Sequence, residues 1–472
     1  MRIADKNFSL IIFGASGALA KYKIFPALYQ MALEGRMPSS YNVIGFARTK
    51  KSHQEFRDEF KESICSKNEN VDLKILESVL DRVFYFTGNY NEESSYTELL
   101  KFTESVEGDI DEVVRLAYFS VPPVVFADVV EGLGATFKKS YAPIRLILEK
   151  PFGSDYAGAK ALKAVLTKHF NQDEIYLLDH YLGKEGVFNL LSLRYANPIF
   201  SYLLQGKYIS NVQITAFESE GLEGRAGYFD AVGTLKDMVQ SHLFQILAFL
   251  TMNVPREFTT ALVHKAKTQS LENMYFDEDP NNVVRAQYSN YKNELGVAEG
   301  SKTETYVAMK LGIDNPDWHG VPIYFRTGKC LAKKWTSVVI EFKPHQNQNK
   351  LNIEGVNRLV IEIQPQEKVE FYMMTKMGGE ELSFVPFTTG KPIYCSGDCL
   401  LEHQRLLLDA IKGDRLLFLD FPEIYASWKQ TDKVMNLFKS NKVDLVEYPC
   451  SSNGPKEADD LLARDGFSWF NG

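Results

Sequence analysis

The sequence has few cysteines and no long apolar run. Five cysteines are spread over its 472 residues, at Cys65, Cys330, Cys395, Cys399 and Cys450. They are too few and too scattered for a disulfide framework, and no second Cys or His pair at metal-ligand spacing follows Cys395 and Cys399. No apolar stretch approaches the roughly 20 residues of a membrane helix, and the N-terminus begins with a strand-like run instead of a signal peptide. We therefore predict a reduced, cytoplasmic protein without a membrane span or a zinc site.

Positive charge is also scarce. Lysine and arginine total 53 against 61 aspartates and glutamates, a net charge of −8. Because nucleic-acid-binding proteins normally carry a basic excess, the balance argues against a nucleic-acid partner. A local group of Lys and His side chains can still hold a small anionic substrate. With 45% hydrophobic residues, a chain of this length buries a large core and forms two or three domains.

The first part of the chain, residues 1–178, alternates short apolar runs with segments of helical spacing. This alternation predicts an α/β domain with a Rossmann-type, doubly wound parallel sheet. The polar stretch 68–103 is expected to hold an irregular connection. The expected strands lie at 9–13, 43–46, 83–86, 116–119 and 144–148, and the expected helices include 20–33 and 124–132.

From residue 179 to 472 strand-like segments dominate, with few helices between them. This density predicts an α+β domain with a mostly antiparallel sheet and packed helices. One sheet face would carry helices and the other would bury a partner subunit. The expected strands lie at 209–217, 283–288, 305–313, 321–326, 336–342, 359–364 and 369–374, and the expected helices at 184–195, 234–251, 399–411 and 422–438.

A short glycine-containing loop follows the first expected strand. It consists of Gly14, Ala15, Ser16, Gly17, Ala18 and Leu19. Glycines let the backbone approach a pyrophosphate, whose charge the N–H groups of the next helix hold. After the second strand the chain has Arg48 where NAD-binding folds usually place an acid, and Arg48 suits the 2′-phosphate of NADP. A plain strand-to-helix turn and a surface basic run remain the alternatives.

Two polar groups follow later strands. Lys150 comes after the strand 144–148, and Asp179, His180, Tyr181 and Lys184 lie together at a loop-to-helix junction. Ligands of open α/β sheets bind beyond the carboxyl ends of the strands, and the donors of His180, Tyr181 and Lys184 suit a dianionic phosphate. A strand-terminating turn and a solvated helix cap are the alternatives.

His242 stands in an otherwise largely apolar helical segment. A lone histidine on a helix is more often structural than catalytic. A buried imidazole nevertheless needs hydrogen-bond partners, and its titration range suits proton abstraction near neutral pH.

Several motifs are spread along essentially the whole chain. They are GASGALAKYKIFPAL, GFAR, EKPFG, DHYLGKE, EGRAGYFDAVGTLKDMVQSHL, ETYVAMKL, GVPIYFRTGK, LLLDAIKGD and GPKEADDLLARDG. DHYLGKE is very specific, whereas the glycine loop alone is not. Together these motifs resemble the glucose-6-phosphate dehydrogenase family.

The resemblance implies NADP-dependent oxidation of glucose 6-phosphate at C1 to 6-phosphogluconolactone, the first step of the oxidative pentose phosphate pathway, by a homodimer or homotetramer. His242 matches the general base and Asp179 the carboxylate that orients it. The phosphate-binding positions match His180, Tyr181 and Lys184. Other substrate-binding positions match Lys150, Glu218, Asp237, Lys329, Lys334 and Gln364. Cofactor contacts match Lys23, Arg48 and Lys150 beside the glycine loop, and the peptide bond before Pro151 is expected to be cis.

The chain departs from the family pattern at three positions. Ala18 replaces the usual Asp, which removes a carboxylate worth about 0.3–1 kcal/mol at a helix N-terminus. Lys334 lies near a position that is often Arg, and Asn453 replaces an expected aromatic residue. The resemblance does not establish a second, structural NADP, which we do not predict. A related dehydrogenase acting on a different or unphosphorylated sugar, and a catalytically silent paralogue, are the competing hypotheses.

Overall fold

A computed structural model describes residues 4, 6–66, 70–222, 224–348, 353–380, 382–392 and 400–472. The chain divides into two compact units, Met1–Gly183 with Asp398–Phe421, and Lys184–Gly397 with Pro422–Gly472. The first break therefore falls near the expected boundary after residue 178. The return of 398–421 to the first unit had no signal in the sequence.

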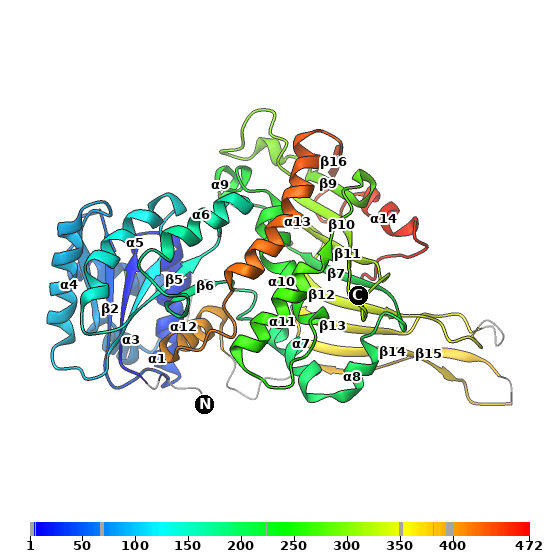
Figure 1. Cartoon of the computed structure of the whole chain (residues 1–472), viewed down its shortest axis with the longest axis horizontal. Helices are drawn as coiled ribbons and strands as arrows, with labels where there is room; N and C mark the ends of the chain where they lie inside the picture. The colour runs from blue at the N-terminus through cyan, green and yellow to red at the C-terminus, as the bar shows by residue number, and fades with distance from the viewer. Residues whose placement is uncertain are drawn as a thin grey trace. The chain divides into compact units, whose positions relative to one another are not determined.

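The first unit is built on a six-stranded parallel sheet with the order β3-β2-β1-β4-β5-β6. Strands β1, β2 and β4 are buried along their whole length, as expected of strands covered on both faces. The order reverses between β1 and β4, which is where such sheets bind ligands. The predicted Rossmann-type sheet is confirmed (Figure 1). The strands are β1 (Phe8–Phe13), β2 (Tyr41–Ala47), β3 (Val83–Thr87), β4 (Val114–Phe119), β5 (Ile144–Glu149) and β6 (Ile175–Leu178).

Helices connect these strands, including two in the stretch 68–103. The prediction of an irregular connection there is wrong, because α3 and α4 flank β3. Their exposed faces are mostly polar, and only a narrow stripe such as Tyr96 and Leu99 on α4 is buried. The helices are η1 (Ala20–Ile24, a π-helix), α1 (Phe25–Leu33), α2 (His53–Cys65), α3 (Leu73–Leu80), α4 (Glu93–Glu107), α5 (Phe126–Ala135), α6 (Tyr156–Leu166) and α12 (Glu402–Lys412).

The second unit is built on a ten-stranded sheet with the order β15-β14-β13-β12-β7-β11-β10-β9-β16, with β8 paired to β10. The pairs β7–β11 and β9–β16 are parallel and the others antiparallel, which confirms the mostly antiparallel prediction. The strands are β7 (Ile209–Phe217), β8 (Met274–Tyr275), β9 (Val283–Tyr288), β10 (Tyr306–Ile313), β11 (Ile323–Gly328), β12 (Trp335–Phe342), β13 (Arg358–Gln364), β14 (Lys368–Lys376), β15 (Phe384–Pro392) and β16 (Leu445–Tyr448).

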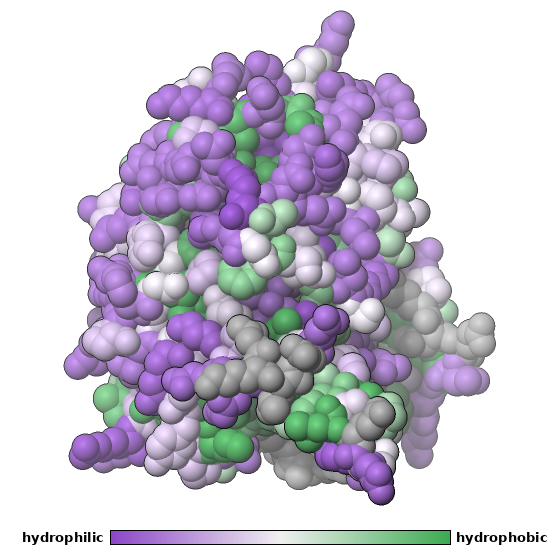
Figure 2. All heavy atoms as spheres, turned by 90° about the vertical axis from the view of Figure 1, so that its right-hand side faces the viewer, coloured by the Kyte–Doolittle hydropathy of each residue, from purple (hydrophilic) through white to green (hydrophobic). Residues whose placement is uncertain are grey.

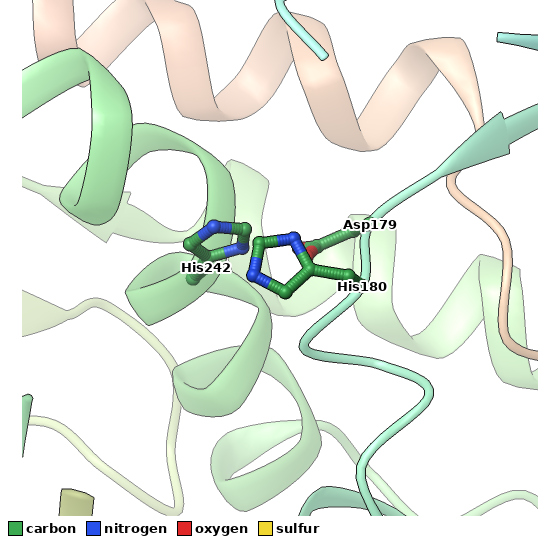
Figure 3. Close-up of side chains that lie close together, drawn as sticks. All are labelled: Asp179, His180 and His242. Atoms are coloured by element: carbon green, nitrogen blue, oxygen red, sulfur yellow. The ribbon is translucent and has the colours of Figure 1, made fainter. Parts of the chain in front are cut away.

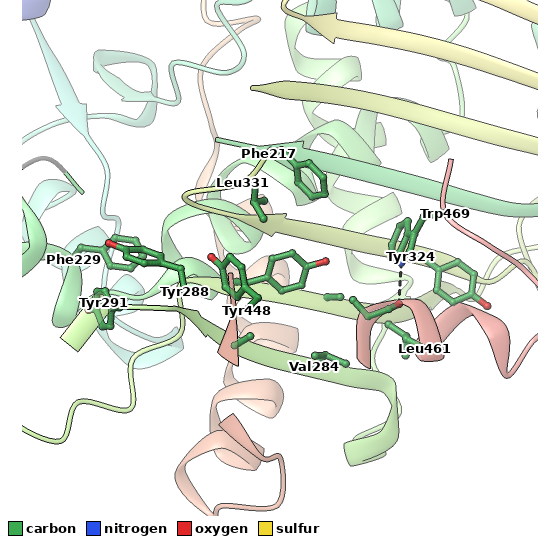
Figure 4. Packing of buried hydrophobic residues seen from close by; sticks show 14 of the residues in the cluster. Phe217, Phe229, Val284, Tyr288, Tyr291, Tyr324, Leu331, Tyr448, Leu461 and Trp469 are labelled. Atoms are coloured by element: carbon green, nitrogen blue, oxygen red, sulfur yellow. Dashed lines mark hydrogen bonds between the residues drawn. The ribbon is translucent and has the colours of Figure 1, made fainter. Parts of the chain in front are cut away.

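Helices and a hydrophobic cluster cover this sheet. The helix η5 packs against β7 and β11, and α7 packs against β13. Figure 4 shows Tyr324 beside Trp469 at one end of the cluster, and Tyr288 beside Tyr291 at the other. The Trp469 indole donates to the carbonyl of Ala458 at 2.9 Å. The helices are α7 (Glu185–Ala196), α8 (Pro198–Leu203), α9 (Ala226–Asp230), η5 (Leu235–Leu243, a π-helix), α10 (Phe244–Thr251), α11 (Thr260–Glu272), α13 (Phe421–Lys439) and α14 (Lys456–Ala463).

Cys330 and Cys450 form a disulfide, so the prediction that the cysteines are reduced is wrong for this pair. The two residues are 120 positions apart, and their Cα atoms lie 4.9 Å from each other. Pairing of Leu331 with Ser452 brings the two segments together, a long-range contact that spacing cannot reveal. Cys395 and Cys399 lie outside the described residues. Within the described ranges, no helix is both long and apolar enough to span a bilayer.

Candidate active site

The glycine loop lies at the carboxyl end of β1, in the middle of the parallel sheet. Gly14 has φ +83°, and a Cβ there would lie 2.2 Å from the carbonyl oxygen of Ser120, so only glycine lets the loop pass so close to the segment after β4. The Gly17 N–H donates to the Gly14 carbonyl at 2.9 Å and closes the turn. A compact turn at the point where the strand order reverses fits a dinucleotide pyrophosphate.

Arg48 follows β2 and is exposed. Its guanidinium lies 5.8 Å from the ring centre of Tyr90. Burial raises the pKa of the Tyr90 phenol, although Arg48 and the Gly14 N–H act in the opposite direction. Tyr90 thus joins the glycine loop to Arg48. We did not predict Tyr90, because it lies in the stretch expected to be irregular. Ala18 and Lys23, on the loop-to-helix segment, are also exposed.

The carboxyl ends of β5 and β6 carry the next predicted residues. Lys150 follows β5, and its peptide bond to Pro151 is cis, as the resemblance implied. Asp179 follows β6 and is buried, and its Oδ1 accepts from the Tyr181 backbone N–H at 2.9 Å. The rings of His180 and Tyr181 lie 5.2 Å apart. Asp179, His180 and Tyr181 therefore occupy the ligand-binding edge of the parallel sheet.

In the second unit, the Lys329 side chain lies close to two carboxylates that were predicted to bind the substrate. Glu218 follows β7 and Lys329 follows β11, and the last residues of these strands, Phe217 and Gly328, are paired. The Lys329 ammonium donates to Glu218 and lies 3.5 Å from Asp237 on η5. Lys329 is only 7% exposed, so the two carboxylates offset the cost of burying its charge.

A second predicted pair lies at the same edge of this sheet. The Lys184 ammonium donates to Gln364 Oε1 at 2.8 Å, and Gln364 Nε2 donates to Thr336 Oγ1 at 2.8 Å. Thr336 is paired with Gln364 and with Ala216, next to the end of β7. Lys334 precedes β12 and is exposed. We call Glu218, Lys329, Lys334 and Gln364 the charged edge of the second unit.

His242 lies on η5 and is fully buried. The π-helix η5 spans Leu235–Leu243, with Asp237 five residues before His242. Because π-helices bond residue i to i+5, Asp237 and His242 fall on similar faces, an arrangement that often marks functional sites. Figure 3 shows the side chains of Asp179 and His180, on the segment after β6, and that of His242 on η5.

Comparison with known proteins identifies the family. The family model "Glucose-6-phosphate dehydrogenase, NAD binding domain" matches residues 11–189, and "Glucose-6-phosphate dehydrogenase, C-terminal domain" matches 191–470. Glucose-6-phosphate 1-dehydrogenase of Chlamydia muridarum is 37% identical, over 98% of this chain and 96% of the relative. That of Bacillus subtilis is 35% identical, over 98% of each chain.

Solved structures agree with these sequence relatives. A glucose-6-phosphate dehydrogenase in complex with its substrate glucose-6-phosphate superimposes with a TM-score of 0.90 at 32% identity, over 100% of both chains. The enzyme of Mycobacterium avium superimposes with a TM-score of 0.89 at 30% identity, over 99% of both chains. The chain therefore belongs to the glucose-6-phosphate dehydrogenase family.

Proposed function

We propose that this protein oxidises glucose 6-phosphate at C1 to 6-phosphogluconolactone with NADP as hydride acceptor, the first step of the oxidative pentose phosphate pathway. The observation that carries the proposal is full-length similarity to glucose-6-phosphate dehydrogenases in a chain that retains His242, Asp179 and the charged edge. The retained pair of His242 and Asp179 disfavours a catalytically silent paralogue.

The first unit supplies the residues for NADP. The loop Gly14–Leu19 binds the pyrophosphate and Arg48 binds the 2′-phosphate. Tyr90 lies between the loop and Arg48 and contacts the part of NADP that joins these two groups. Lys23 and Lys150 add positive charge. When bound, NADP supplies a nicotinamide that accepts hydride. Arg48 is planar and always charged, so it can hold a phosphate through two parallel hydrogen bonds.

The second unit supplies most of the residues for the sugar phosphate. His180, Tyr181 and Lys184 bind the phosphate, and Lys150, Glu218, Asp237, Lys329, Lys334 and Gln364 bind the sugar or its phosphate. A sugar hydroxyl can replace Lys329 as the partner of Glu218 or Asp237, since Lys329 already holds both carboxylates near one point. The amide of Gln364 likewise offers the phosphate side of the site a donor and an acceptor.

His242 performs the proton transfer. Its imidazole accepts the proton of the C1 hydroxyl as hydride leaves C1, and Asp179 stabilises the resulting imidazolium. C1 loses two electrons and becomes the carbonyl carbon of a lactone. A buried imidazole keeps its proton from bulk water, which suits a base that works once per turnover.

An assay of nicotinamide reduction tests the proposed activity. We expect kcat/KM for glucose 6-phosphate to exceed that for glucose by about a hundredfold or more. Glucose has no phosphate, so the side chains that bind the phosphate are left without their charged partner when glucose occupies the site. Equal kcat/KM values for glucose 6-phosphate and glucose would instead favour a dehydrogenase whose substrate is an unphosphorylated sugar. No reduction with any sugar phosphate would favour the silent paralogue.

We also propose that two copies of the chain associate through the outer end of the large sheet. Met373 on β14 and Phe387 on β15 are directly paired and are 39% and 47% exposed. On the side of the second unit that carries these strands, Figure 2 shows hydrophobic patches between polar side chains. An edge hairpin is a place where another chain can associate, and exposed apolar side chains on it favour such a contact. A dimer or a tetramer would bury it.

We propose the cytoplasm as the compartment, since a sugar phosphate and NADP are both charged metabolites held inside cells. Fractionation of cells followed by immunoblotting tests this. We expect the protein in the cytosolic fraction, and its recovery in another compartment would contradict the proposal.

A further inference from the structure

A buried polar group lies beside the predicted phosphate-binding residues. Glu149 is the last residue of β5, directly before Lys150. The Tyr118 hydroxyl, on β4, donates to Glu149 Oε1 at 2.6 Å, and His403 Nε2 lies 3.3 Å from the same oxygen. The His403 and Glu149 side chains are 10% and 13% exposed. A carboxylate this buried needs such partners.

Tyr118 serves this group only as a donor. Burial, and then the nearby Glu149 carboxylate, raise the pKa of the Tyr118 phenol well above its ordinary value. The phenol therefore stays protonated near neutral pH and keeps its hydrogen bond to Glu149. His403 is the other group beside Glu149, and its ring also lies against a residue of the candidate site.

His403 meets His180 through its ring. The two imidazoles are nearly parallel, with 18° between their planes and 6.4 Å between their centres. The backbones beside them are also close, because a Cβ on Gly183 would lie 2.8 Å from the carbonyl oxygen of Glu402. The start of α12 therefore packs against the segment that carries His180, although more than 200 residues separate them in sequence.

We propose that His403 is a positioning residue that holds His180 for the substrate phosphate, with Glu149 and Tyr118 fixing His403 in turn. The inference rests on the proposed function, in which His180 binds that phosphate. The Glu149 carboxylate holds one edge of the His403 ring through an electrostatic contact of 3.3 Å, without an aligned hydrogen bond. The flat face of this ring limits the rotation of His180 about its side-chain bonds. His403 does not touch the sugar and has no part in proton transfer. Its loss should weaken phosphate binding and spare the chemical step.

The test compares His403→Phe with wild-type enzyme on two substrates. Phenylalanine keeps a flat ring but cannot be oriented by Glu149. We expect KM for glucose 6-phosphate to rise about tenfold, the size of one lost charge-assisted hydrogen bond, with kcat within about twofold. The kcat/KM for glucose should not change, since glucose has no phosphate. His403→Tyr, which restores a ring with a polar end toward Glu149, should recover most of the loss.

The controls separate the possible failures. A wild-type enzyme that does not prefer glucose 6-phosphate over glucose would overturn the proposed function itself. A normal preference combined with an equal loss on both substrates, or no loss, in His403→Phe would overturn only the role of His403. If His403→Phe does not fold, His403→Gln takes its place. It keeps a polar end but lacks the ring, and the same selective rise in KM for glucose 6-phosphate is expected.

Discussion

At the scale of single residues, Arg48 should decide between the two nicotinamide cofactors. Arg48→Ala should raise KM for NADP about tenfold or more and leave KM for NAD within about twofold, because only NADP carries the 2′-phosphate. Lys50→Ala is the matched control, since Lys50 is also basic and exposed but is not assigned to the cofactor. Steady-state kinetics with both cofactors measures the effect. Equal losses for NADP and NAD would refute the role of Arg48.

Sequence reasoning could name most candidate residues but not the partners that hold them. Lys184, Lys329 and Gln364 belong to family motifs or positions. The sequence does not reveal that Lys184 bonds to Gln364 and Lys329 to Glu218, because each pair joins segments that are far apart along the chain. Tyr90 and His403 had no signal at all, because their partners are distant in sequence. The roles of His242 and Asp179 stay predictions until variants are measured.

At the scale of helices and strands, a buried ion pair joins α11 to α13 in the second unit. Lys267 Nζ lies 2.8 Å from Glu423 Oε2, and His264 Nδ1 lies 2.6 Å from Glu423 Oε1. The Lys267 and Glu423 side chains are fully buried. Burial alone would raise the pKa of Glu423, but the charges of Lys267 and His264 lower it below its ordinary value.

Glu423→Gln should lower the free energy of unfolding by about 3–5 kcal/mol, because it leaves the Lys267 charge buried without a countercharge. The double variant Lys267→Met/Glu423→Leu removes both charges and should recover much of the lost free energy of unfolding. Urea unfolding followed by tryptophan fluorescence is suitable, since all four tryptophans lie in the second unit. Glu278→Gln, at the exposed pair with Lys433 in the same unit, is the control and should cost less than about 1 kcal/mol.

The same pair gives a pH dependence with a defined sign. Because the pKa of Glu423 is lowered on folding, its contribution to stability is present above the unfolded value near 4.5 and is lost as the pH falls through the folded value. The difference between wild type and Glu423→Gln should therefore shrink in acid. A difference that stays constant down to the folded pKa would contradict the ionised state of Glu423.

The elements that sequence reasoning missed are those with weak or long-range signals. The strands 8–13 and 41–47 were evident from their apolar runs. The helices α3 and α4 were missed because their buried stripes are narrow, and β15 because its side chains are mostly exposed. The π-helical form of η5 depends on its packing and has no pattern in sequence.

At the scale of the whole molecule, the proposed subunit contact makes a direct prediction. Phe387→Glu should shift the protein toward monomer, because it places a charge in a buried apolar interface. Thr388→Glu adds the same charge to the next side chain of β15, which points to the opposite face, and should leave the assembly intact. Sedimentation velocity measures both. An unchanged oligomer with Phe387→Glu, or dissociation with Thr388→Glu, would place the interface elsewhere.

The assignment of His242 as the proton acceptor depends most directly on one comparison, His242→Asn against wild type. Asparagine keeps the approximate size of the side chain and removes its basicity. We predict that kcat falls about a hundredfold to ten-thousandfold, while the dissociation constant of glucose 6-phosphate, measured by calorimetry, stays within about threefold. If kcat falls by less than about tenfold, another group accepts the proton.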